Sequence, residues 1–212
     1  MKSGPFIDLV ADTLGVERGT TRVVARSLRE AGWLTTGPRG RNAPDMTSVD
    51  ASRLIIALMT GATPARALAQ FEVFRCLRLV GDAPLDAALK RRLPARSSHT
   101  IEDVLVLLLE AVISGPQAFT TDSGEPGIVG FLLQVNETAQ SALVMIGRDK
   151  FNFVNTSGPA RSRTSDAGHG IQTTRSITYL ELEIIAQSLD RQPQKRARTN
   201  VSQDAGGAAD AK

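Results

Sequence analysis

The chain has few of the residues that build disulfides, metal sites and catalytic centres. Its 212 residues include one cysteine and two histidines. A single cysteine excludes an intramolecular disulfide and makes a thiolate metal cluster within one chain implausible. His99 and His169 lie in no recognised catalytic pattern, and neither a phosphate-binding glycine loop nor a His-Glu-x-x-His arrangement occurs. We therefore expect no enzyme activity, no metal and no cofactor.

Long apolar segments are also missing. No stretch approaches the ~20 apolar residues that a transmembrane helix needs, and the first residues do not form a signal peptide. Hydrophobic residues nevertheless make up 42% of the chain, which indicates a folded protein. The expectation is a soluble, cytoplasmic protein that does not bind a membrane.

Positive charge is concentrated in one segment, from Arg18 to Arg41. The net charge of the chain is only +3, but this segment has six arginines and one acid, Glu30, a local balance of +5. Such a cluster attracts phosphate groups through counterion release. The arginines are Arg18, Arg22, Arg26, Arg29, Arg39 and Arg41.

The spacing in this segment predicts a helix-turn-helix. A first helix begins near Pro5 and ends at Gly15, and a second runs from about Gly19 to Ala31. Apolar residues recur on one face of the second helix and arginines on another. In a helix-turn-helix the second helix lies in the major groove of DNA, where arginine binds guanine and threonine contacts phosphate or a thymine methyl. The predicted DNA contacts on this helix are Arg18, Thr20, Thr21, Arg22, Arg26 and Arg29.

A basic loop follows the second helix. Strands at 33–36 and 45–47 would enclose the loop from Gly37 to Pro44, as in the wing of a winged helix. Arg39 and Arg41 would reach the minor groove or flanking phosphates from this loop, and Trp33 would anchor it in the core. The alternative is that the arginines form only a solvated face and a solubilising hairpin, since most charge runs are solvated.

The rest of the chain predicts an α+β fold: an N-terminal winged helix-turn-helix, central helices, and a C-terminal antiparallel β-meander with a final helix. The expected domains are 1–62 (DNA binding), 63–115 (helical connection or oligomerisation), 116–190 (meander and helix) and 191–212 (a disordered tail). The expected helices are 48–60, 63–80, 85–93, 101–114 and 179–189, and the expected strands are 128–135, 141–146, 150–155 and 171–176.

The segment from Ile7 to Thr47 resembles the winged helix-turn-helix of bacterial and phage regulators. More narrowly, the sequence from Gly19 to Met59 is similar to the N-terminal part of uncharacterised proteins encoded by alphaproteobacterial prophages. The resemblance implies DNA contacts by Thr20, Thr21, Arg22 and Arg26 on the recognition helix and by Arg39 and Arg41 on the wing. It implies no particular role, because repressors, activators and terminase small subunits share such modules.

Two functions are compatible with these observations. The first is a sequence-specific transcriptional regulator that binds double-stranded DNA as a homodimer, because a dimer doubles the contacts and reads two half-sites. The alternative is a phage packaging or assembly component, such as a terminase small subunit, which would form a larger oligomer with weak sequence preference.

Overall fold

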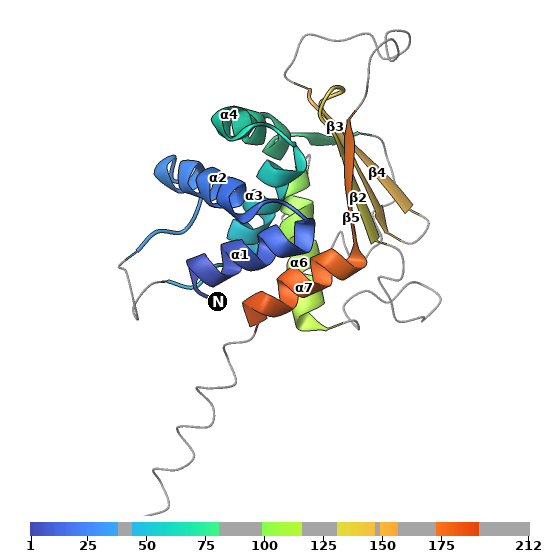
Figure 1. Cartoon of the computed structure of the whole chain (residues 1–212). Helices are drawn as coiled ribbons and strands as arrows, with labels where there is room; N and C mark the ends of the chain where they lie inside the picture. Colours follow the sequence, from blue (N-terminus) through green and yellow to red (C-terminus); the bar gives the residue numbers. More distant parts are fainter. Residues whose placement is uncertain (38–43, 81–98, 116–130, 147–148, 157–172, 191–212) are drawn as a thin grey trace, which may run out of the picture.

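The computed structural model describes residues 1–37, 44–80, 99–115, 131–146, 149–156 and 173–190. Over these ranges the chain has six helices and one five-stranded antiparallel sheet, which confirms the predicted α+β class. The helices of the N-terminal half lie to one side of the sheet, and the last helix packs back against them (Figure 1).

The N-terminal half is a bundle built around one buried helix. Helix α1 (Ser3–Leu14) and helix α2 (Arg18–Glu30) are joined by a three-residue turn that begins at Gly15, whose φ of 64° is the left-handed conformation that ends many helices. Helix α3 (Ser48–Met59) lies at the centre, with nine buried residues. Helix α4 (Pro64–Arg75) packs against both α2 and α3.

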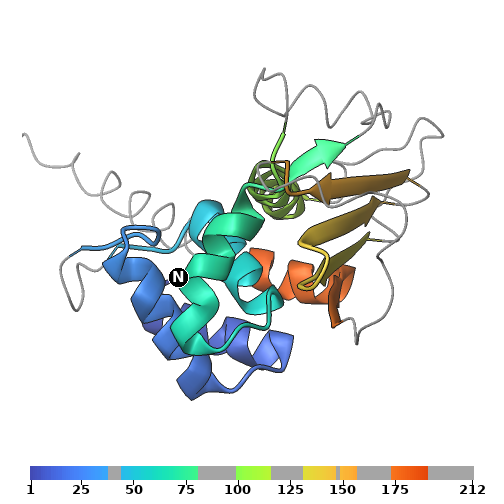
Figure 2. The ribbon, with the colours of Figure 1, turned by 90° about the horizontal axis from the view of Figure 1, so that it is seen from above.

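The sheet has the strand order β1-β4-β3-β2-β5, with every neighbouring pair antiparallel. Its strands are β1 (Arg78–Val80), β2 (Phe131–Asn136), β3 (Ser141–Ile146), β4 (Asp149–Val154) and β5 (Thr174–Thr178). Buried residues alternate along β2, so one face of the sheet is packed against the protein interior. Helix α6 (Ile101–Ser114) lies between α4 and the sheet, and α7 (Tyr179–Asp190) follows β5 directly (Figure 2).

A single hydrophobic core connects these elements. Strand β1, from the segment 63–115, pairs with β4 of the segment 116–190, and α7 packs on α1 and α3. One hydrophobic core therefore extends across the boundaries expected at residues 62 and 115.

The sequence prediction that one helix runs from Thr63 to about Val80 is wrong. Helix α4 ends at Arg75, and the chain turns through Cys76 into β1. The backbone N–H groups of Leu77 and Leu79 donate to the carbonyls of Phe74 and His99, at 3.0 Å each. The apolar period misled the prediction because Leu77 is also fully buried, although it lies beyond the helix.

The two strands predicted to flank the basic loop do not pair with each other in the described residues 33–37 and 44–47. Asp45 forms an isolated antiparallel bridge with Lys2 instead, and the N–H of Met46 donates to the carbonyl of Met1 at 2.8 Å. The wing itself, with Arg39 and Arg41, lies mostly outside the described residues. So do the predicted helix 85–93 and the tail 191–212.

Candidate nucleic-acid interface

The outer face of α2 exposes three arginines. Arg18, Arg22 and Arg26 recur every four residues, and their side chains are 57%, 61% and 76% exposed. The opposite face of the helix buries Thr21, Val24, Ala25 and Leu28 against the core. Helix α2 lies at the edge of the molecule, beside α1 and α4 (Figures 1 and 2).

Two carboxylates of α1 hold two of these arginines. Arg18 donates from Nε and Nη2 to the two carboxylate oxygens of Asp12, at 2.7 and 2.5 Å. Arg22 binds Asp8 in the same two-pronged way, at 2.9 and 2.7 Å. These hydrogen bonds lower the pKa of both carboxyls below the ordinary 3.8, so both are ionised at neutral pH. The N-terminal arginines of α2 are therefore already paired within the molecule.

The remaining arginines of α2 also have partners. Arg26 pairs with Glu30 on the next turn, at 2.7 Å. Arg29 is only partly exposed and donates to the Ser3 hydroxyl at 2.7 Å. Asp8, Asp12 and Glu30 pair with three of the four arginines of α2, and with Glu17 at the start of the helix these four acids and four arginines sum to a formal charge of zero. The balance of +5 for residues 18–41 includes Arg39 and Arg41, which lie outside the described residues, and omits the acids of α1 and the turn, so it does not describe the surface of α2.

Glu17 forms the start of α2. Its carboxylate accepts from the backbone N–H of Gly19 at 3.1 Å and of Thr20 at 2.8 Å. The Thr20 hydroxyl donates to the same group at 2.6 Å and is the largest cause of the lowered pKa of Glu17. Thr21 is fully buried and donates to the carbonyl of Glu17 at 3.1 Å. This burial corrects the expectation that Thr21 contacts DNA, because its side chain has no access to a ligand.

A buried carboxylate joins the two ends of the basic loop. Asp50, which is 2% exposed, accepts from the backbone N–H and the hydroxyl of both Thr35 and Thr47, at 2.7–2.9 Å. Gly37 and Pro44 are also in contact, since a Cβ added at Gly37 would lie 2.6 Å from the Pro44 ring. The chain therefore leaves and re-enters this region at one fixed place, and Arg39 and Arg41 lie on the segment between.

Trp33 anchors the same region, as expected from the sequence. Its ring packs edge-on against Phe71, with 5.6 Å between centroids, and the guanidinium groups of Arg53 and Arg75 lie 5.3 and 4.3 Å from the ring centroid. Both guanidinium groups donate to the carboxylate of Glu102, at 2.7 and 2.8 Å. The root of the loop is thus tied to α3, α4 and α6 by cation–π contacts and a shared ion pair.

Arg18, Arg22 and Arg26 lie on one exposed surface, whereas Arg29 is partly buried and bonds Ser3 of α1. Sequence reasoning missed the carboxylates of Asp8 and Asp12, which belong to the preceding helix. A signal was available: these two acids are four residues apart, as are the two arginines that they bind, across a three-residue turn.

No family model, curated protein or solved structure matches the chain. In the described ranges, no group of three or more His, Cys, Asp or Glu side chains is placed to hold a metal ion. No single helix in those ranges is long and apolar enough to cross a membrane; α3 and α4 have enough length and hydropathy only as a pair bent by 116°.

Proposed function

We propose that this protein binds double-stranded DNA through the outer face of α2 and acts as a transcriptional regulator. The observation that carries the proposal is the helix-turn-helix order of α1 and α2, with Arg18, Arg22 and Arg26 exposed in one row on the second helix. A row of this kind fits the phosphates and guanine edges along a major groove.

The basic loop supports the proposal. Asp50 holds the two ends of the loop together. The backbone N–H of Trp33 donates to the Leu28 carbonyl of α2 at 2.8 Å, so these ends lie close to the C-terminal end of α2. The described ends of the segment whose sequence includes Arg39 and Arg41 are therefore anchored beside the proposed recognition helix. A hairpin of two strands is not required for this arrangement, since side chains hold the loop instead.

The ion pairs of Arg18 with Asp12 and of Arg22 with Asp8 limit the affinity that this surface can have for DNA. Each phosphate that contacts Arg18 or Arg22 competes with Asp12 or Asp8 for the guanidinium. Carboxylates on this face also repel phosphates, so we expect moderate affinity for random duplex, with tighter binding only where base contacts or a second α2 helix contribute. A homodimer would present two such helices to two half-sites.

Fluorescence anisotropy with a random duplex and with a duplex selected from a random library tests the proposal. Arg22→Ala should weaken binding to both and relax the base preference, whereas Arg39→Ala should weaken binding evenly across sequences. Arg78→Ala is the matched control, because Arg78 is an exposed arginine on the far sheet edge. Unaltered affinity in both Arg22→Ala and Arg39→Ala would refute the proposal.

The second candidate is an assembly component that works through protein contacts. It is favoured by the exposed apolar pair Leu180 and Ile184 on α7, which are 60% and 41% exposed and four residues apart. Light scattering distinguishes the two candidates. A dimer that binds duplex supports the regulator, whereas a larger ring without duplex binding supports assembly.

A further inference from the structure

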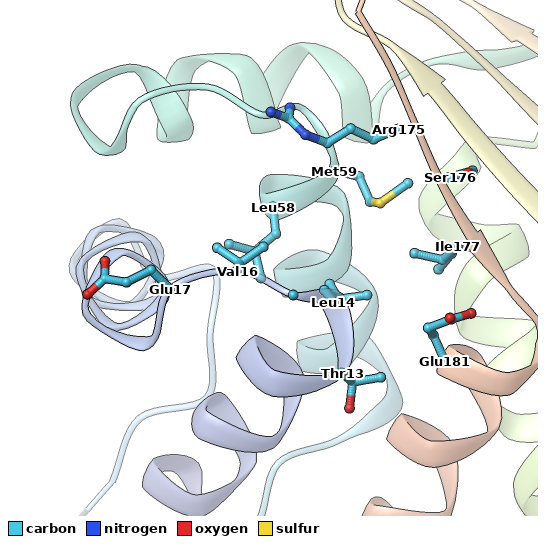
Figure 3. Close-up of a pocket in the computed structure, with 11 residues that line it drawn as sticks. Thr13, Leu14, Val16, Glu17, Leu58, Met59, Arg175, Ser176, Ile177 and Glu181 are labelled. Carbon is cyan, nitrogen blue, oxygen red and sulfur yellow. The ribbon is translucent and has the colours of Figure 1, made fainter.

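A cleft of about 500 Å³ opens between the N-terminal helices and the last strand and helix. It is bordered by the end of α1 and the following turn, the end of α3, β5 and the first turn of α7 (Figure 3). This volume is in the range of pockets that hold small organic molecules. Its apolar lining consists of Leu14, Val16, Leu58, Met59 and Ile177.

Two carboxylates line the cleft, but both already have donors. Glu17 accepts the three hydrogen bonds that start α2. Glu181 accepts from the backbone N–H of Thr178 at 2.8 Å and from its hydroxyl. Hydrogen bonds from threonine hydroxyls are the largest cause of the lowered pKa of each carboxyl. Their negative charge is therefore compensated locally, at the positive ends of two helices.

The guanidinium of Arg175 is not compensated in this way. Arg175 is exposed to solvent, and its guanidinium has no hydrogen bond or ion pair with any residue that the structure describes. It lies directly over Gly61, where an added Cβ would be 0.9 Å from Nη1. Figure 3 places it at one end of the cleft and Glu181 toward the other, with the apolar side chains between them.

We propose that this cleft binds a small organic anion with an apolar body. The carboxylate or sulfonate of the ligand pairs with the Arg175 guanidinium, whose planar donors suit two-pronged binding. The aliphatic or aromatic body lies against Leu14, Val16 and Ile177. The site does not depend on DNA binding, but its wall includes the turn between α1 and α2, so an occupant contacts the start of the arginine-bearing helix.

A pair of dyes that differ in charge tests the proposal on the full chain. Anilinonaphthalene sulfonate has the required anion and apolar rings, and N-phenyl-1-naphthylamine has similar rings without the sulfonate. We expect the sulfonate dye to bind with one-to-one stoichiometry. Arg175→Gln should weaken it about tenfold and change the neutral dye by less than about twofold, because only the charged hydrogen bonds are lost. Arg78→Gln, at the opposite edge of the sheet, should change neither dye.

Competition on the unaltered protein provides a second measurement that needs no folded variant. Decanoate should displace the sulfonate dye at a concentration at least about tenfold lower than decanol does. Equal displacement by the two, or equal loss of both dyes in a folded Arg175→Gln protein, would overturn the assignment of Arg175 as the anion-binding group. Binding of several dye molecules without saturation would overturn the cleft as a defined site.

Discussion

Removing the two acids of α1 should increase DNA affinity. Asp8→Asn and Asp12→Asn keep the size of each side chain but remove the charges that now hold Arg22 and Arg18. Phosphates then no longer compete with an intramolecular carboxylate for these guanidinium groups. Substitutions that test a DNA-binding surface usually remove arginines and weaken DNA binding, whereas these two substitutions remove acids and should strengthen it.

The size of the gain follows from the exposure of the pairs. Both arginine side chains are more than half exposed, and ion pairs in such surroundings are worth a factor of roughly two to five in an equilibrium constant. Each substitution should therefore raise the affinity for duplex by about that factor, and the double variant by roughly tenfold. Each additional phosphate contact should also steepen the slope of log K against log salt by about 0.9.

Anisotropy titrations at several salt concentrations measure both quantities. Glu137→Gln is the control for each single substitution, because it also removes one negative charge, in the turn between β2 and β3 on the sheet rather than on α1 or α2. An affinity gain in the double variant that does not exceed the control, or a loss of affinity, would refute the competition between Asp8, Asp12 and phosphate.

The same two acids make stability depend on pH. Their pKa values are lowered in the folded protein relative to 3.8, so their contribution is fully present above pH 3.8 and is lost as the pH falls through the lowered values. Urea unfolding between about pH 2 and pH 6 should give a smaller acid-induced loss of stability in the double asparagine variant than in the unaltered protein. An identical pH profile in both proteins would contradict the ion pairs.

Three further substitutions test the surrounding framework, each by urea unfolding. Asp50→Ala removes the acceptor of four hydrogen bonds at the loop ends and should cost about 3 kcal/mol; a loss below about 1 kcal/mol would mean that the loop is held elsewhere. Glu102→Ala leaves the guanidinium groups of Arg53 and Arg75 half-buried and unpaired beside Trp33, and should also cost about 3 kcal/mol. The fluorescence emission of this single tryptophan should shift as well. Unchanged emission would argue that the ion pair with Glu102 does not hold the two arginines against the Trp33 ring. Thr21→Val should cost about 1 kcal/mol and change duplex affinity by less than about twofold; a larger loss of binding would mean that Thr21 becomes accessible on DNA.

Local signals in the sequence predicted much of the fold. Helix α6 begins and ends at the predicted residues, because Thr100 and Asp103 form a complete capping box and Gly115 follows its last residue as the C-cap. Strand β3 also has its predicted bounds, and α7 begins at the predicted Tyr179. Caps, turns and alternation act over a few residues, so one sequence is sufficient to read them.

Features that depend on distant residues were not predicted. Strand β1 exists because β4 and Thr100 supply its partners, about seventy and twenty residues away in the sequence, and no local period indicates them. The flanks of the basic loop do not form strands because side chains satisfy their backbone: Asp50 accepts from Thr35, and Arg53 donates to the Trp33 carbonyl at 2.8 Å. The candidate site was half predicted for the same reason, since its arginines lie on one helix, whereas Asp8 and Asp12, which pair with Arg22 and Arg18, lie on the preceding helix.

The central claim is that the outer face of α2 binds double-stranded DNA. The most direct test is the salt dependence of duplex binding in the unaltered protein and in the variant with Arg18→Gln, Arg22→Gln and Arg26→Gln. If all three arginines contact phosphates, the slope of log K against log salt should become less steep by roughly 2.7, and the affinity should fall by more than about tenfold. An unchanged slope and affinity in a folded triple variant would show that DNA, if bound at all, is bound elsewhere.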